Sequence, residues 1–101
     1  MADGSTLWIL ENFDERFEAW CELETPSDDV RYAVANWLIS RLEDPYEGVH
    51  RESGFEDLWW GSIPGTLENG LQVCCSYWIY ESRHTVRCDS FGSLGPVFKT
   101  W

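Results

Sequence analysis

The residues best suited to chemistry are the basic side chains around one predicted turn, Arg83, His84 and Arg87, with Tyr80 just before it. A histidine can act as a general acid or base, and arginines can hold a phosphate and stabilise the charge that develops on it. A ribonuclease needs both a general acid or base and groups that hold the phosphate. The alternative is a solvated hairpin whose arginines pair with carboxylates such as Asp89, in contacts worth at most about 1 kcal/mol.

No other group of residues matches a catalytic or metal-binding motif. The two histidines, His50 and His84, have no ligand spacing, and the four cysteines contain no C-x-x-C pair. The segment Gly61-Ser62-Ile63 lacks the G-x-S-x-G pattern of a hydrolase nucleophile. We therefore expect no metal ion and no cofactor, and we expect the cysteines to be small, buried, reduced thiols.

A second group of interest is aromatic and consists of Trp59, Trp60, Trp78 and Tyr80. Adjacent Trp59 and Trp60 must point to opposite sides of a strand, so one enters the core and the other lies on the open sheet face. An exposed aromatic patch on a small protein marks an interaction site. If the C-terminal tail at 97–101 folds over that face, the same side chains are core instead.

Charge is the third feature, because eighteen acidic residues against seven basic ones give a net charge of −11. Residues 1–30 alone hold nine acids and one arginine. The predicted acidic face consists of Glu11, Asp14, Glu15, Glu18 and Glu22. Such a field repels nucleic-acid phosphate and anionic membranes and favours a basic protein partner. A solvated acidic face and a mimic of nucleic acid are the alternatives.

Two helices follow a short first strand at 6–10. Apolar residues recur with helical spacing from Phe13 to Cys21, and Asn12 can cap that helix. Thr25 and Pro26 are typical of a second helix start, and its apolar stripe runs from Val30 to Leu42 before Asp44-Pro45 ends it. The acids of the first helix fall largely off its apolar stripe.

Three strands are predicted after a connecting loop at 46–56, at residues 57–63, 71–80 and 85–91. In the second of them one face carries Leu71, Val73, Cys75, Tyr77 and Ile79, and the other carries Gln72, Cys74, Ser76, Trp78 and Tyr80. Residues 81–84 then turn the chain into a hairpin. The fold class is therefore α+β, with the order β-α-α-β-β-β, an antiparallel sheet and both helices on one face. We expect one domain over residues 1–101, with its core at 6–94 and a tail at 95–101.

The location expected from the N-terminal sequence is the cytoplasm. Met1-Ala-Asp-Gly lacks the basic start of a signal peptide, and no apolar run is long enough to span a bilayer.

The order of elements resembles the RelE/ParE superfamily of small bacterial toxins, including its phage-derived, HigB-like branch. The resemblance covers Leu7 to about Leu94 and rests on Leu42-Glu43-Asp44-Pro45, the segment from Gly54 to Gly61 and the hairpin from Val73 to Phe91. It implies two helices on a sheet whose last strand faces the substrate. Members that cut messenger RNA on the ribosome look basic on that sheet face.

The basic positions of the family are degenerate here. Trp59 and Trp60 stand where the family often shows arginine or lysine, and the last strand ends in Asp89, Ser90 and Phe91 rather than in a basic pair. The leading hypothesis is therefore a module that binds a host or cognate protein with a basic surface or an apolar groove, with a homodimer as a further arrangement. The rival hypothesis is an mRNA endonuclease that uses the basic cluster.

Overall fold

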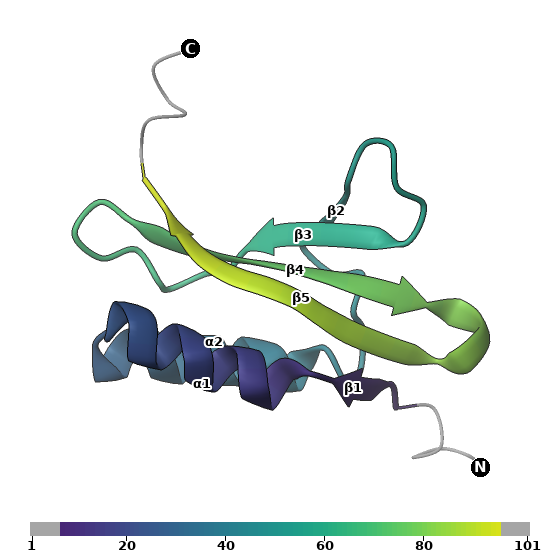
Figure 1. Cartoon of the computed structure of the whole chain (residues 1–101), viewed down its shortest axis with the longest axis horizontal. Coiled ribbons are helices and arrows are strands. Elements are labelled where there is room, and N and C mark those ends of the chain that lie inside the picture. Colours follow the sequence, from purple (N-terminus) through teal and green to yellow (C-terminus); the bar gives the residue numbers. More distant parts are fainter. Residues whose placement is uncertain (1–6, 96–101) are drawn as a thin grey trace.

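The sheet is the centre of the structure, a computed structural model that describes residues 7–95. Its five strands lie in the order β1-β5-β4-β3-β2. The elements along the chain are β1 (Ile9–Glu11), α1 (Phe13–Glu24), α2 (Asp28–Ser40), β2 (His50–Arg51), β3 (Leu58–Ser62), β4 (Gln72–Tyr80), the short 3₁₀ helix η2 (Glu81–Arg83) and β5 (Thr85–Leu94). Both α-helices cover the same face of the sheet (Figure 1). The predicted α+β class and helix placement are thus confirmed.

Two details of the sheet differ from the prediction. β1 pairs with β5 in parallel, through Ile9 and Thr85, so the sheet is mixed rather than wholly antiparallel. His50 and Arg51, predicted as loop, form a short edge strand against β3. Of the predicted tail, only Gly95 belongs to the described residues, and the predicted start of the first strand at 6 also lies outside them.

α1 begins after Asn12 as predicted, but the capping interactions of the two helices differ from the predicted ones. Asn12 adopts a left-handed conformation and makes no side-chain cap. Thr25 does not start α2 but closes α1, where its N–H donates to the Cys21 carbonyl oxygen at 2.9 Å. Ser27 caps α2 by accepting from the N–H of Val30 at 3.2 Å. A serine cap satisfies one of the free N–H groups of the first turn.

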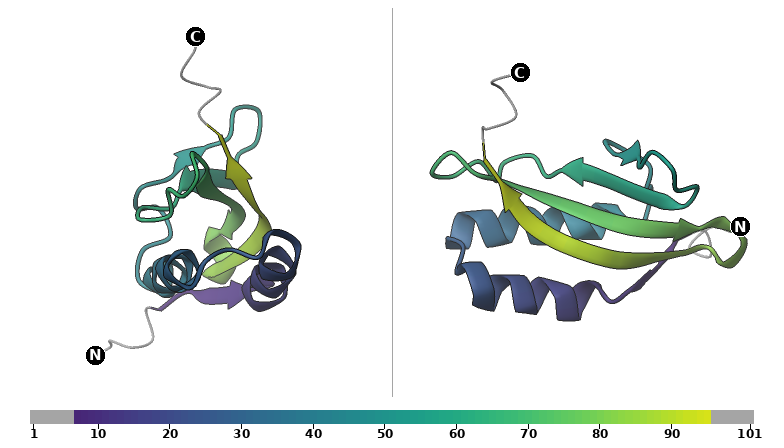
Figure 2. Two further views of the ribbon diagram at one scale, coloured as in Figure 1. Left: turned by 90° about the vertical axis from the view of Figure 1, so that its left-hand side faces the viewer. Right: turned by 45° about the horizontal axis from the view of Figure 1, so that its top comes forward.

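The core lies between the helices and the inner face of the sheet, the face toward the helices (Figure 2). β4 contributes every second one of its residues to the core. Among residues 7–95, the buried apolar residues are Trp8, Phe13, Trp20, Val30, Val34, Ile63, Val73, Cys75, Tyr77, Ile79, Val86 and Cys88. Gly61 allows close approach to this layer from the loop after α2, since an added Cβ would lie 2.9 Å from the Gly48 carbonyl oxygen. Every second residue of β4, from Val73 to Ile79, is buried, so the predicted alternation along this strand is confirmed.

Candidate interaction site

The face of the sheet away from the helices, which we call the outer face, carries the candidate site. Strand register places Leu58 opposite Trp78 and Trp60 opposite Ser76, so β3 and β4 contribute alternate residues to one surface. Tyr80 follows Trp78 on the same side of β4 because side chains alternate along a strand. The described residues place both helices on the other side of the sheet (Figures 1 and 2).

The aromatic rings of the outer face lie in two separate pairs. Trp60 is 39% exposed, and its ring centre lies 5.4 Å from that of His50 in β2. The Trp78 ring meets Phe55 edge-on at 6.0 Å. Next to Trp60, a shallow hollow of about 270 Å³ runs along β4 and β5. Partly exposed aromatic rings beside a hollow are typical of protein-binding surfaces.

Trp59 lies on the inner face, as the alternation of the strand requires. Its ring packs edge-on against Tyr46 at 5.1 Å, and Tyr46 in turn meets Trp8 at 6.1 Å. The Tyr46 hydroxyl donates to the carboxylate of Glu81 at 2.5 Å. Desolvation, and then this bond to Glu81, raises the pKa of the Tyr46 phenol. Trp59 thus belongs to an aromatic cluster that packs the loop after α2 onto the sheet.

The basic residues of the turn have different surroundings. The Arg83 guanidinium lies over the Tyr80 ring at 4.6 Å. The His84 ring stacks on the buried Trp8 ring at 4.0 Å, on the other side of the turn. Arg87 lies further along β5, opposite Trp78. Arg83 and Arg87 therefore border the outer face, whereas His84 is held against the core.

The predicted acidic residues also separate into two groups. Glu11 belongs to β1 and lies beside Arg87 in the strand register. The other four, Asp14, Glu15, Glu18 and Glu22, are exposed on α1. Across residues 7–95, no three His, Cys, Asp or Glu side chains gather in a way that could hold a metal ion. Neither of the described α-helices is long and apolar enough to cross a membrane.

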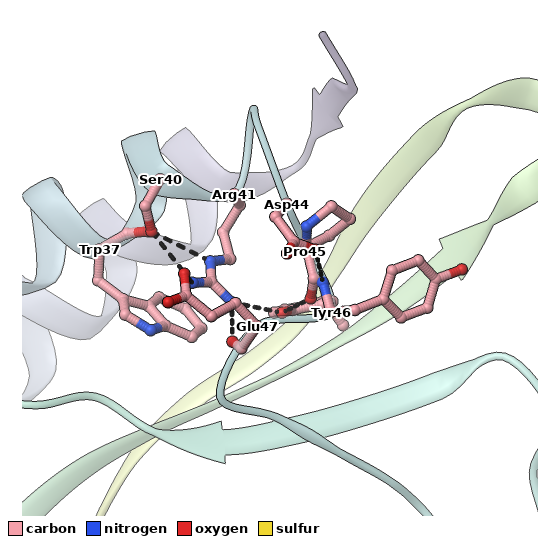
Figure 3. A network of polar contacts seen from close by, with 8 residues as sticks. Trp37, Ser40, Arg41, Asp44, Pro45, Tyr46 and Glu47 are labelled. Atoms are coloured by element: carbon pink, nitrogen blue, oxygen red, sulfur yellow. Dashed lines mark hydrogen bonds and ion pairs between the residues drawn. The ribbon is translucent and has the colours of Figure 1, made fainter. Parts of the chain in front are cut away.

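Arg41 is a buried charge that was not among the predicted site residues (Figure 3). Only 2% of this residue is exposed, and its guanidinium lies 4.2 Å from the Trp37 ring centre. It donates to the Glu47 carbonyl oxygen at 2.7 Å and to the Tyr77 hydroxyl at 3.1 Å. The Tyr77 hydroxyl donates to the Pro45 carbonyl oxygen. The network holds the loop after α2 against the inner face of β4.

The sequence did contain a signal for this network. Trp37 and Arg41 are four residues apart, so a helical turn brings their side chains together. Arginine stacks on aromatic faces and can satisfy several acceptors at once, which makes it the cation that tolerates burial best. These contacts give Arg41 a structural role, because they tie the end of α2 and the loop after it to Tyr77 of β4.

The architecture described above defines a class, the RelE-like α+β fold. A solved structure that shares it is that of the E. coli toxin RelE, a double arginine-to-alanine mutant in the free state, with a TM-score of 0.60 over 85% of this chain and 82% of that chain. The two sequences are 16% identical, so the likeness establishes the fold alone. No family model matches the sequence, and no curated protein matches it.

Proposed function

We propose that the chain is a small protein-binding module on a toxin-like scaffold, which inhibits or redirects a host or cognate protein. The observation that carries the proposal is the outer face, where Trp60, Trp78 and Tyr80 share one surface on the side away from the helices. Tryptophan and tyrosine lose little side-chain entropy on binding and bury large areas, so they dominate binding energies. A phage-derived, HigB-like origin with degenerate catalytic positions belongs to the same proposal.

The charge of the chain supports a protein partner over a nucleic acid. Because the net charge of the chain is −11, its field would repel polyphosphate that approached the sheet. A protein with a basic or apolar surface meets no such barrier. Arg83 and Arg87 border the outer face and would then take part in orienting the partner rather than in holding a phosphate.

The test compares proteins captured from a host lysate by the immobilised chain and by three variants. Trp60→Ala and Trp78→Ala remove outer-face rings, and Leu67→Ala removes an exposed apolar side chain from the loop between β3 and β4 as a control. We expect a partner whose recovery falls at least about tenfold in both tryptophan variants and stays unchanged in the control. If only RNA or ribosomes are recovered, or if every variant captures equally, the proposal is wrong.

A second candidate function is a ribosome-associated mRNA endonuclease. It is favoured by the likeness in fold to a protein described as a toxin, and by the position of Arg83 and Arg87 beside the outer face. Purified chain added to a translating extract would then produce discrete messenger fragments. Arg83→Ala and Arg87→Ala would abolish them, whereas the protein-binding function predicts no fragments with any variant.

A further inference from the structure

The surface between α1 and α2 carries a groove that the outer-face proposal does not use. Two adjoining hollows, of about 610 and 400 Å³, share Phe17 and Ala35 and therefore form one trough along the helix pair. On the α1 side the trough extends from Phe13 to Glu22, which corresponds to about 14 Å at the rise of an α-helix. We call this trough the helix groove.

The floor of the helix groove is apolar. Besides Phe17 and Ala35 it includes Cys21, Leu38 and Leu42. Two large side chains of α2 stand at its edge with most of their surface in solvent, Tyr32 at 74% and Ile39 at 62% exposed. Apolar side chains that stay this exposed beside a concave surface gain free energy when a partner covers them.

The rim of the helix groove is acidic. Its carboxylates are Asp14, Glu15, Glu18, Glu22 and Asp28. The single cation among the lining residues is Arg31, and its guanidinium is already paired with Asp28 at 2.5 Å. An occupant therefore meets an apolar floor between uncompensated negative charges.

These features select one kind of occupant. We propose that the helix groove binds a basic amphipathic α-helix of a partner protein, with apolar residues at i, i+3, i+4 and i+7 and with lysine or arginine on both flanks of that stripe. An amphipathic helix laid in an apolar groove is a recurrent mode of recognition, and its flanking cations would meet the carboxylates of the rim. A second copy of this chain fits less well, because its own acidic rim would face the same charges.

The test uses a designed peptide of about 15 residues with a leucine stripe flanked by lysines, and a twin with glutamates in place of the lysines. Calorimetric titration should show the basic peptide binding at least about tenfold more tightly than its acidic twin, with a difference that shrinks as salt is added. Backbone amide chemical shifts should change on α1 and α2 rather than on the outer face.

Four variants locate the binding. Tyr32→Asp and Ile39→Asp place a charge at exposed positions of the groove, so the fold is kept, and each should weaken the basic peptide at least about tenfold. The double variant Glu18→Lys/Glu22→Lys should weaken the basic peptide about fivefold and strengthen the acidic twin. Leu67→Asp, an exposed change outside the groove, should alter neither.

Three results would overturn the proposal. The first is no binding of the basic peptide, or equal binding of the two peptides. The second is shift changes confined to the outer face, or binding that Trp60→Ala abolishes and Ile39→Asp leaves intact. The third is a dimer of the free chain that Ile39→Asp dissociates, which would assign the groove to a second copy. The tryptophan variants test the outer face separately, so each proposal can fail without the other.

Discussion

The two faces of β4 are made by alternate residues of one strand, yet they differ in how their side chains are held. On the inner face Val73, Tyr77 and Ile79 are fully enclosed by helices and loop. On the outer face Trp78 and Tyr80 are only partly covered by Phe55 and the Arg83 guanidinium. The difference indicates that stability is concentrated on one side of the strand. The other side, which contributes less to stability, is the one on which we propose that a partner binds.

The largest expected effect of a single substitution is on the inner side, in Arg41→Ala. Loss of the guanidinium leaves the Glu47 carbonyl oxygen without its donor, removes a bond to Tyr77 and exposes the Trp37 face. We expect the free energy of unfolding to fall by about 3 kcal/mol, measured by urea denaturation.

The matched control for Arg41 is Arg16, an arginine exposed on α1. Arg16→Ala should change the free energy of unfolding by no more than about 0.5 kcal/mol. A loss below about 1 kcal/mol in Arg41→Ala would show that the buried guanidinium does not hold the loop after α2 in place.

The next effect separates two tyrosines of the same strand. Tyr77→Phe removes the bonds to Arg41 and to the Pro45 carbonyl oxygen and should cost about 1–2 kcal/mol of unfolding free energy. Tyr80→Phe, on the outer face, should cost less than about 0.5 kcal/mol. Equal losses in the two variants would contradict the contrast between the faces.

The same tyrosine predicts how stability depends on pH. Burial raises the pKa of Tyr77 to about 12, although the Arg41 bond acts in the opposite direction. The folded state therefore retains the phenol proton more tightly than the unfolded chain, whose tyrosines ionise near pH 10. The contribution of the Tyr77 phenol to the free energy of unfolding is complete below about pH 10 and is lost as the pH rises toward 12. Wild type should lose more stability across this window than Tyr77→Phe.

The contrast between the faces was predictable where local spacing determines it. The alternation from Val73 to Tyr80 predicts which side chains are buried, since side chains of a strand alternate between the two faces. The opposite directions of Trp59 and Trp60 follow from the same geometry. The hairpin turn after Tyr80 is likewise a local signal.

Strand pairings between distant segments of the chain leave no such pattern in the sequence. The parallel contact of β1 with β5 joins residues more than seventy positions apart, as in Ile9 and Thr85, and neither segment encodes its partner's direction. The two-residue strand at His50 is too short for any period. The spacing of Trp37 and Arg41 indicates a contact between their side chains. A charged residue after a helix is normally exposed, so the burial of Arg41 follows only from its tertiary partners.

The aromatic part of the site could be predicted from the sequence, whereas the arrangement of its basic residues could not. The sequence identified Trp59, Trp60, Trp78 and Tyr80 as candidates. The strand register places the last three on one face, whereas Trp59 packs against Tyr46 on the inner face. The sequence also grouped His84 with Arg83 by proximity along the chain. The turn separates the two side chains, because His84 adopts a left-handed backbone conformation and its ring stacks on Trp8.

The smallest expected effect is a difference in reactivity between two neighbouring thiols, one on each face of β4. It leaves stability unchanged. Cys74 is half-buried at the outer-face hollow, whereas Cys75 is buried on the inner face. Burial, and then its hydrogen bond with Cys88, raises the pKa of the Cys75 thiol well above its usual value, so little reactive thiolate forms. In a Cys21→Ser background, mass spectrometry should show Cys74 alkylated at least about tenfold faster than Cys75 near pH 8, with the difference abolished in urea. Comparable rates in the folded protein would mean that β4 opens readily, and the inner face could not then be the stable half of the contrast.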